Sequence, residues 1–335
     1  MNKPDRVIHI ACQADARFGP DCAVMLHSLF TANPDEKFEV HFLYHPELAA
    51  DVLEGLAEIC VRFGARWSPL AVADSRMEGF PFVPHYGGYA ACYRLLLPEL
   101  LPQVAKVLYL DADILVVDRI RALWDTPLGT YCVAAVTNPL FAHMVRRITT
   151  TLGLADGRDY FNSGVLLLDL DRLRSSGLFR ELVAFVREGR APLVWPDQDP
   201  LNAVLWRHRL PLHPRWNATN GIFDLPSRYM PWSRRELDEA KADPAIVHFV
   251  GPYKPRHYRL RHPYRPRYFK HLAQTRWRGL PIEGRSIKHM VLRPLPVLWQ
   301  WFLENAGRTA MRLVRGLATR LKRIWRRTNA MQARS

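Results

Sequence analysis

The chain has 335 residues, of which 48% are hydrophobic and 24% are charged, the usage of an ordinary globular protein that is long enough for one large α/β unit with appendages. Its formal net charge of +15 is unevenly distributed: residues 254–335 contain 21 of the 47 Lys and Arg but only two of the 32 acidic residues. The rest of the chain is therefore slightly acidic. A basic C-terminal segment indicates a polyanionic partner, either nucleic acid or an anionic membrane.

The five cysteines are dispersed and form no C-x-x-C pair, so neither a zinc ribbon nor a redox motif is expected. Several lie in apolar segments, where a buried free thiol is typical, and this favours a reducing compartment. The first residues contain no long apolar run with a cleavage signature, and no run of about 18 apolar residues occurs in the chain. We therefore expect a cytoplasmic protein without a membrane-spanning helix.

Hydrophobic periodicity predicts strands that alternate with helices along most of the chain. Strands are expected at 7–12, 38–44, 66–72, 107–110, 114–117, 131–137, 160–170 and 245–250, with a further extended segment at 211–216. Helices are expected at 22–31, 48–63, 89–101, 141–152, 173–187 and 200–206, and an irregular loop rich in Pro, Gly and aromatic residues at 80–93. This alternation predicts βαβ units and a largely parallel sheet, whose ligands bind beyond the carboxyl ends of the strands.

The segment KVLYLDADILVVD, residues 106–118, is the most informative of these. Asp111 and Asp113 lie between two apolar runs, and carboxylates two residues apart on an extended chain project to the same side. Their repulsion and desolvation are costly unless a cation lies between them. Mg²⁺ or Mn²⁺ suits such hard oxygen ligands and keeps positions for substrate phosphates. The segment predicts a metal site that holds a diphosphate; a solvated surface turn is the alternative.

The C-terminal segment changes character after residue 251. Residues 290–302 are strongly apolar but are interrupted by Pro294 and Pro296. Apolar residues then recur at helical spacing from Ala310 to Trp325, with Arg and Lys on the other faces. A basic amphipathic helix with an interfacial Trp is typical of a membrane-surface element. The alternative is a helix that packs on the globular body.

Four ordered segments, VLYLDADILV, YFNSGVLLLDL, WPDQDPLN and VHFVGPYKP, resemble the family 8 glycosyltransferases. The likeness is to the bacterial lipo-oligosaccharide α-galactosyltransferases and the lipopolysaccharide core hexosyltransferases, and it covers residues 7–255. The resemblance implies a retaining, metal-dependent enzyme that uses a UDP-hexose donor. It also implies a GT-A catalytic domain at 1–255, followed by a basic and aromatic extension at 256–335.

The resemblance assigns Mn²⁺, or Mg²⁺, to Asp111, Asp113 and His248. By itself His248, in an apolar strand, would be taken for a core histidine. Lys254 would neutralise charge on the departing UDP while the metal acts as a Lewis acid; its alternative is one more C-terminal cation. Ala112 and Gly251 are placed in the same donor site.

For the nucleoside, the resemblance places Asp15 beside the uracil and ribose and Phe18 on the base. Arg17 departs from the family pattern, which has Asn there. Arg94 matches an arginine near the donor sugar, where its fork would grip a phosphate or hydroxyl; an ordinary helix salt bridge is the alternative. Asn162 would bind sugar hydroxyls, and otherwise is a turn asparagine before Gly164.

Asp197 and Gln198 match the family's D-Q pair beneath the anomeric carbon. Glutamine is a poor nucleophile, so the resemblance implies front-face substitution, in which the leaving UDP oxygen takes the acceptor proton. Asp197 would hold a donor hydroxyl, and the structural interpretation of this cluster, an acidic helix N-terminus, is compatible with that role. Asn138 and Arg256 depart from the family pattern on the acceptor side and after Lys-Pro.

These observations together predict a peripheral enzyme on the inner face of the cell membrane that transfers galactose or glucose from a UDP-sugar to a membrane-anchored glycan. The lipopolysaccharide core is the most plausible acceptor, and no nucleic acid is expected. Three alternatives remain: a nucleic-acid-binding protein that uses residues 253–278, a non-catalytic scaffold with the same fold, and a glycogenin-like self-glucosylating enzyme. Donor and acceptor choice would depend on loops at 80–89 and 138–142.

Overall fold

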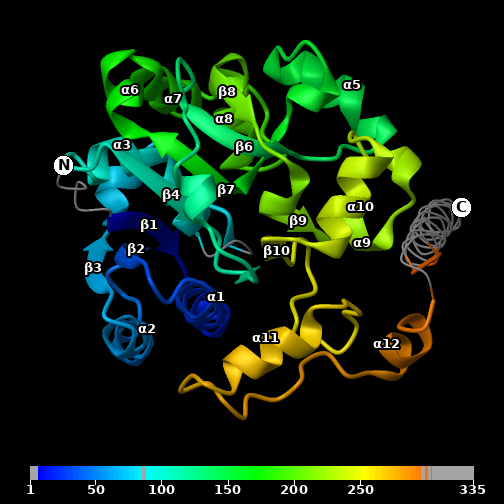
Figure 1. The fold of residues 1–335 in the computed structure, drawn as a ribbon. Coiled ribbons are helices and arrows are strands. Elements are labelled where there is room, and N and C mark those ends of the chain that lie inside the picture. The colour runs from blue at the N-terminus through cyan, green and yellow to red at the C-terminus, as the bar shows by residue number, and fades with distance from the viewer. Residues whose placement is uncertain (1–6, 85–87, 296–298, 301–302, 304–335) are drawn as a thin grey trace, which may run out of the picture.

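The computed structural model describes residues 7–84, 88–295, 299–300 and 303. Within these residues a seven-stranded sheet with the order β3-β2-β1-β4-β7-β6-β8 forms the centre of the molecule (Figure 1). Its strands are β1 (Val7–Gln13), β2 (Lys37–Tyr44), β3 (Arg66–Ala71), β4 (Lys106–Leu110), β6 (Val133–Thr137), β7 (Phe161–Asp169) and β8 (Arg209–Pro211). All neighbours pair in parallel except β7, which is antiparallel to both β4 and β6. The sheet is mostly parallel, as the sequence predicts for a GT-A fold.

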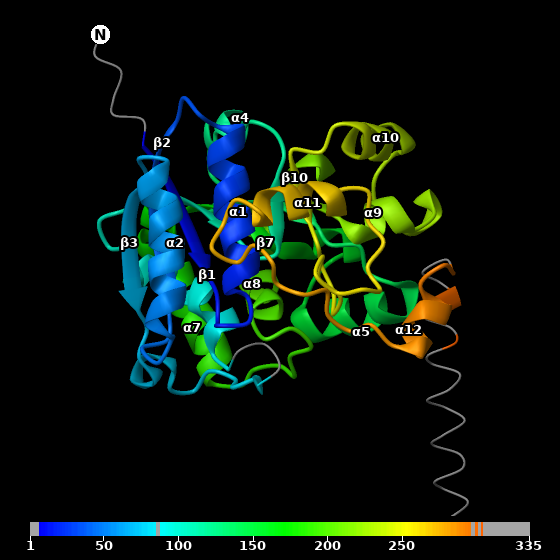
Figure 2. The same ribbon diagram turned by 90° about the horizontal axis from the view of Figure 1, so that it is seen from below.

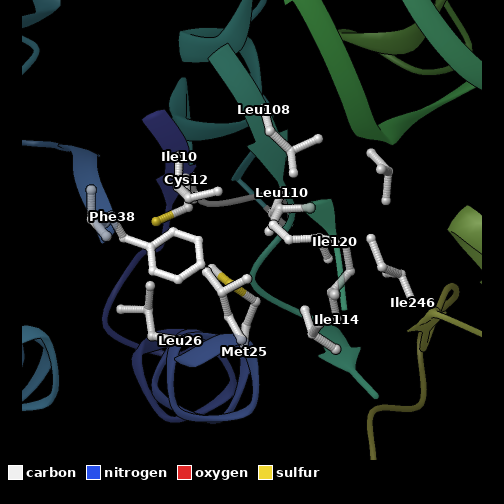
Figure 3. Close-up of a cluster of buried hydrophobic side chains, with 14 of the residues drawn as sticks. Ile10, Cys12, Met25, Leu26, Phe38, Leu108, Leu110, Ile114, Ile120 and Ile246 are labelled. Carbon is white, nitrogen blue, oxygen red and sulfur yellow. The ribbon is translucent and has the colours of Figure 1, made fainter. Parts of the chain in front are cut away.

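Helices cover both faces of this sheet, which explains why its central strands are apolar throughout. On one face lie α1 (Gly19–Ala32) and α2 (Ala50–Arg62), and Figure 3 shows Met25 and Leu26 of α1 against Ile10, Cys12 and Leu110 of the strands. The other face is covered by α3 (Leu97–Leu100), α6 (Leu170–Ser175), α7 (Leu178–Arg187) and α8 (Gln198–Leu205). All five cysteines are buried and free, as expected.

A second, three-stranded sheet positions residues of the predicted metal site. It has the order β5-β10-β9, with β5 (Ile114–Val116), β10 (Ile246–His248) and β9 (Ala218–Thr219). The chain therefore changes sheets at Asp111-Ala112-Asp113, between β4 and β5. Antiparallel pairing of β5 with β10 places His248 opposite Ile114, next to Asp113. A residue 135 positions away in the sequence is brought to the turn in this way.

Three sequence predictions of secondary structure are wrong in detail. Residues 89–101 form a 3₁₀ segment (Ala90–Leu96) and one α-helical turn (Leu97–Leu100), since Pro98 supplies no N–H to an i→i−4 bond. The single helix expected at 173–187 is divided into α6 and α7 because Gly177, at φ +81°, takes the left-handed conformation. The extended segment at 211–216 ends early, because a 3₁₀ turn begins at Pro214.

The remaining described helices are α4 (Arg121–Trp124), α5 (Ala142–Leu152), α9 (Asn220–Asp224), α10 (Arg234–Ala242), α11 (Arg265–Leu272) and α12 (Ile287–Leu292). From below, α11 crosses beside α1, and α12 lies away from it on the side of α5 (Figure 2). Tyr268 of α11 donates a 2.7 Å hydrogen bond to the buried Asp21 of α1. In the part of the chain that the structure describes, no helix has the length and apolar character needed to cross a bilayer.

The predicted basic amphipathic helix at 310–325 lies outside the described residues. The division of the chain at residue 255 stays a prediction. What the structure adds is that Arg256 is buried and contacts Asp21 at 3.6 Å and Glu283, so the first part of the basic segment is tied to the N-terminus of α1.

Candidate active site

Asp111, Asp113 and His248 form a cluster whose ligand atoms all lie within 4.8 Å of one another. His248 Nε2 lies 3.2 Å from Asp113 Oδ1 and 3.7 Å from Asp111 Oδ2. The two aspartates come from the β4–β5 turn and His248 ends β10. His248, a core histidine on sequence grounds alone, is indeed buried, but its Nε2 atom faces the two carboxylates.

The orientation of the His248 ring is fixed by an asparagine. Its Nδ1 atom lies 2.9 Å from Asn217 Oδ1, so Nδ1 carries the proton and Nε2 keeps its lone pair for a ligand. Asn217 in turn donates from Nδ2 to Asn162 Oδ1 at 2.7 Å. Hydrogen bonds of this kind determine the tautomer and orientation of metal-binding histidines.

The two aspartates differ in charge environment. Burial raises the pKa of Asp111, and although Arg94 opposes this, Asp113 adds to it. Burial alone would also raise the pKa of Asp113, but Lys254 and His248 hold it well below its usual range. A divalent cation would relieve the repulsion between the two carboxylates.

Gly164 in β7 allows the cluster to be this compact. A Cβ atom at this position would lie 2.3 Å from His248 Cε1 and 2.6 Å from Asp111 Oδ2. The backbone approaches as closely on the other side, because the Asp111 N–H donates to the Gly164 carbonyl at 2.9 Å. The glycine of the N-S-G sequence is therefore required by packing against the cluster of Asp111, Asp113 and His248.

Arg94 connects the cluster of Asp111, Asp113 and His248 to Asp197 of the D-Q pair. Its guanidinium is buried and lies 2.8 Å from Asp111 Oδ1 and 3.2 Å from Asp197 Oδ2. It also donates to the carbonyl of Ser163 at 2.9 Å and lies over the Tyr109 ring. The two carboxylates belong to other elements of the chain, so the salt bridges of Arg94 join separate elements and do not lie within its own 3₁₀ segment.

Gln198, the first residue of α8, lies beneath Asn162 and Ser163 of β7. Its Oε1 atom accepts from the Ser163 N–H at 3.0 Å and from Asn162 Nδ2 at 3.2 Å. Asp197 makes no helix-capping hydrogen bond; it accepts from Ser163 Oγ at 2.7 Å. Asp197 thus lies at the acidic N-terminus of α8, as the sequence predicts, while its carboxylate contacts Ser163 and Arg94.

The residues assigned to the nucleoside lie at the start of α1. Asp15 is half-buried, and its carboxylate accepts from the Phe18 N–H at 2.9 Å, which closes the turn between β1 and α1. The Phe18 ring is half-buried, 5.7 Å from Lys254 Nζ. Lys254 donates to Asp113 and to the Phe249 carbonyl, so it lies between the Phe18 ring and the cluster of Asp111, Asp113 and His248.

Two smaller residues predicted in the site have structural roles. Gly251 is exposed at φ +90°, a left-handed conformation that turns the chain after β10 and returns Lys254 toward Asp113. Ala112 is buried between the two aspartates, against the hydrophobic core.

Three residues depart from the family pattern: Arg17, Asn138 and Arg256. Asn138 Oδ1 accepts from Asn162 Nδ2 at 3.2 Å, at the edge of the Gln198 cluster. Arg256 contacts Asp21 and donates to the Arg17 carbonyl at 3.4 Å, so it stabilises the turn between β1 and α1. The Arg17 guanidinium lies 4.8 Å from the centre of the Phe18 ring.

Sequence reasoning missed several residues that organise this site: Asn217, Ser163, Tyr109, Tyr160 and Asp199. Ser163 and Asp199 stand inside motifs that were recognised, so their position could have drawn attention to them. Asn217 has no local signal, because its role depends on β9 pairing with β10.

The donor set suits a hard divalent cation. Two carboxylates and a neutral imidazole are typical ligands of Mn²⁺ and are compatible with Mg²⁺, and they leave coordination positions for phosphate oxygens. Lys254 and Arg94 provide further positive charge on either side of the cluster. The residues present therefore fit the metal that the sequence predicts.

Comparison with known proteins finds relatives over most of the chain. General stress protein A of Bacillus subtilis (strain 168) is 32% identical over 283 residues, which are 82% of this chain and 96% of that protein. Lipopolysaccharide glucosyltransferase WaaO of Escherichia coli (strain K12) is 22% identical over 255 residues, 75% of this chain and 73% of WaaO. The structure of the galactosyltransferase LgtC in complex with donor and acceptor sugar analogs has a TM-score of 0.71 and 26% identity, covering 82% of this chain and 98% of LgtC. The model of Glycosyl transferase family 8 matches residues 9–259, and the chain belongs to this family of glycosyltransferases.

Proposed function

We propose that this glycosyltransferase is a retaining, Mn²⁺-dependent enzyme that transfers galactose or glucose from a UDP-sugar to a membrane-anchored glycan. The observation that carries the proposal is the continuous arrangement from Asp111, Asp113 and His248 through Arg94 to Asp197. One end suits a metal-bound diphosphate, and the other, with Gln198 and Asn162, suits a sugar ring.

The donor would bind with its uracil on Phe18 and its ribose near Asp15. A bound Mn²⁺ would supply Lewis-acid stabilisation of the diphosphate leaving group. Lys254 adds a cation on the same side, 5.7 Å from the Phe18 ring and in contact with Asp113. Arg94 and Asn162 would orient the hexose from the opposite side.

Among these residues no carboxylate is free near the proposed position of the sugar, and this supports retention rather than inversion. Asp197 is held by Arg94 and Ser163, and Asp199 is buried and accepts from the Tyr160 hydroxyl. In front-face substitution the bond from the anomeric carbon to the UDP oxygen breaks and the bond to the acceptor oxygen forms on the same face. The acceptor proton passes to the departing phosphate oxygen. Gln198 would stabilise the positive charge that develops on the anomeric carbon.

The acceptor is inferred from relatives and from the C-terminal segment. Lipopolysaccharide glucosyltransferase WaaO and a lipopolysaccharide 1,3-galactosyltransferase of Salmonella typhimurium (strain LT2) both match this chain over about three quarters of its length. In α12, Ile287 and Val291 are 77% and 63% exposed, next to cationic residues of a strongly basic segment. Exposed apolar and basic groups together suit an anionic membrane, where the protein would lie on the cytoplasmic face.

The nucleic-acid alternative draws less support from the same segment. Arg256 and Arg259 are buried and bonded to Glu283 and to Gln300 Oε1, respectively, so they are unavailable to phosphates. Tyr268 is also buried, with its hydroxyl bonded to Asp21. Among the described residues, we find no feature that favours a glycogenin-like activity over transfer to a separate acceptor.

The test is a screen of UDP-sugars for Mn²⁺-dependent hydrolysis and transfer, followed by assignment of the anomeric configuration of the product. We expect one UDP-hexose to be used and an α-configured product. Asp111→Ala should abolish metal-stimulated UDP binding and turnover. Unchanged Mn²⁺-dependent hydrolysis in this variant would refute the metal assignment, and an inverted product would refute the mechanism.

A further inference from the structure

The Gln198 side chain is buried and held at both ends of its amide group. Its Oε1 atom accepts from the Ser163 N–H and from Asn162, on the side where the proposed function places the donor sugar. Its Nε2 atom lies 3.0 Å from the hydroxyl oxygen of Tyr160, on the protein side. The two ends differ chemically, because the oxygen only accepts hydrogen bonds and the nitrogen only donates them.

The Tyr160 hydroxyl donates its own proton to Asp199 and not to Gln198. It lies 2.6 Å from Asp199 Oδ1, and Tyr160 is completely buried. The other oxygen of Asp199 accepts from the backbone N–H groups of Val194 and Trp195. Burial raises the pKa of Asp199, and its hydrogen bonds to Tyr160 and to the two N–H groups oppose this. The ionised carboxylate can only accept, so Tyr160 then donates to Asp199, and its oxygen presents lone pairs to Gln198. Burial raises the pKa of Tyr160 well above its usual range, so the hydroxyl keeps its proton.

We propose that Asp199 and Tyr160 are positioning residues that hold the Gln198 amide with its oxygen toward the donor sugar. The inference rests on the proposed function, in which positive charge develops on the anomeric carbon near Gln198. An amide oxygen stabilises such charge, whereas an amide NH₂ in its place would oppose it. Asp199 thus acts at a distance, by setting the direction of two successive hydrogen bonds.

The variant Asp199→Asn tests the direction of these bonds and not merely their presence. The N–H groups of Val194 and Trp195 require an oxygen, so the new NH₂ group must face Tyr160. The Tyr160 hydroxyl would then accept from Asn and direct its proton toward Gln198. This favours the reversed amide, whose NH₂ would meet the Ser163 N–H, donor against donor.

We expect Asp199→Asn to lower kcat by about 100-fold and Tyr160→Phe by about 10-fold, with the KM for the UDP-sugar changed less than about threefold. The informative variant is the double one. Tyr160→Phe removes the hydroxyl that misdirects Gln198, so the double variant should have a kcat higher than that of Asp199→Asn alone. A purely structural role predicts the opposite, a double variant as slow as or slower than the worse single variant, and that result would overturn the proposal.

Tyr268→Phe provides a matched control, because it removes another hydrogen bond from a buried tyrosine to a buried aspartate, 2.7 Å long. It should lower the thermal midpoint about as much as Tyr160→Phe while leaving kcat unchanged.

If Asp199→Asn does not fold, the effect of Tyr160→Phe on kcat is compared in the wild-type and Gln198→Met backgrounds. Its effect on kcat should vanish in the Gln198→Met background, where no amide remains to be oriented; an undiminished effect would refute the positioning role.

Failure of this proposal is distinguishable from failure of the proposed function. Wild-type protein that transfers no hexose from any UDP-sugar contradicts the proposed function. Wild-type protein that transfers hexose, together with Asp199→Asn and Tyr160→Phe variants of unchanged kcat, contradicts only the roles of Asp199 and Tyr160.

Discussion

The Nδ1 atom of His248 and the Oδ1 atom of Asn217 lie 2.9 Å apart and are buried, His248 at the end of β10 and Asn217 just before β9. This bond determines which nitrogen of the imidazole faces Asp111 and Asp113. It also connects His248 to Gln198, because Asn217 donates to Asn162, whose own Nδ2 atom donates to Gln198. The ends of the site are thus joined by side-chain amides.

Asn217→Ala is expected to weaken Mn²⁺ binding by about 10- to 100-fold, because the His248 ring loses the partner that fixes its tautomer. Asn217→Asp keeps an acceptor for Nδ1 and should retain most of the affinity. Titration followed by electron paramagnetic resonance of free Mn²⁺ measures both. Equal affinity in Asn217→Ala and wild-type protein would show that the hydrogen bond does not orient the ligand.

Gly164→Ala is expected to lower turnover by about 100-fold or more, because its Cβ would overlap His248 and Asp111 and displace them. Gly221→Ala is the matched control, since the nearest side-chain atom to its added Cβ would be at 3.5 Å. Kinetics and circular dichroism should show both variants folded and only the first impaired. Full activity in Gly164→Ala would contradict the tight packing of the cluster.

Asp21 should make stability depend on pH. Burial raises its pKa to about 6, against about 3.9 in an unfolded chain. Between these values the folded state binds more protons than the unfolded state, so the free energy of unfolding falls as the pH rises from about 4 to about 6. Asp21→Asn lacks this titration, so wild-type stability relative to the variant should fall by up to about 3 kcal/mol over this range. Thermal midpoints of both proteins at pH 4.5 and pH 7 measure the change; a constant difference would contradict the buried, raised carboxyl.

The exposed apolar residues of α12 should contribute to membrane binding. Ile287→Glu with Val291→Glu is expected to lower co-sedimentation with anionic vesicles about tenfold, because it replaces apolar contacts with repulsive charges. Val61→Glu is the control, since Val61 is 73% exposed on α2. Truncation after residue 285 should release the protein further. Equal sedimentation of full-length and truncated protein would refute membrane association through this segment.

Much of the fold could be predicted from local pattern. For the first two strands, the expected ends differ from the observed ends by no more than one residue, because the apolar runs of these strands are buried on both faces of the sheet. Errors occurred where one residue's backbone overrides periodicity: Gly177 divides a helix, and Pro98 and Pro214 favour 3₁₀ turns. The ordered motifs identified the family, which the comparisons confirm.

The sequence by itself determined the composition of the site: Asp111 and Asp113 after a buried strand, the N-S-G and D-Q-D segments, and a histidine in a late strand. Only the tertiary structure decided which atoms meet. The pairing of β5 with β10 brings His248 to Asp113, Arg94 joins Asp111 to Asp197, and Asp199 directs Tyr160 toward Gln198. Local periodicity reports which face of an element is buried, but the direction of a buried hydrogen bond depends on partners that are distant in the chain.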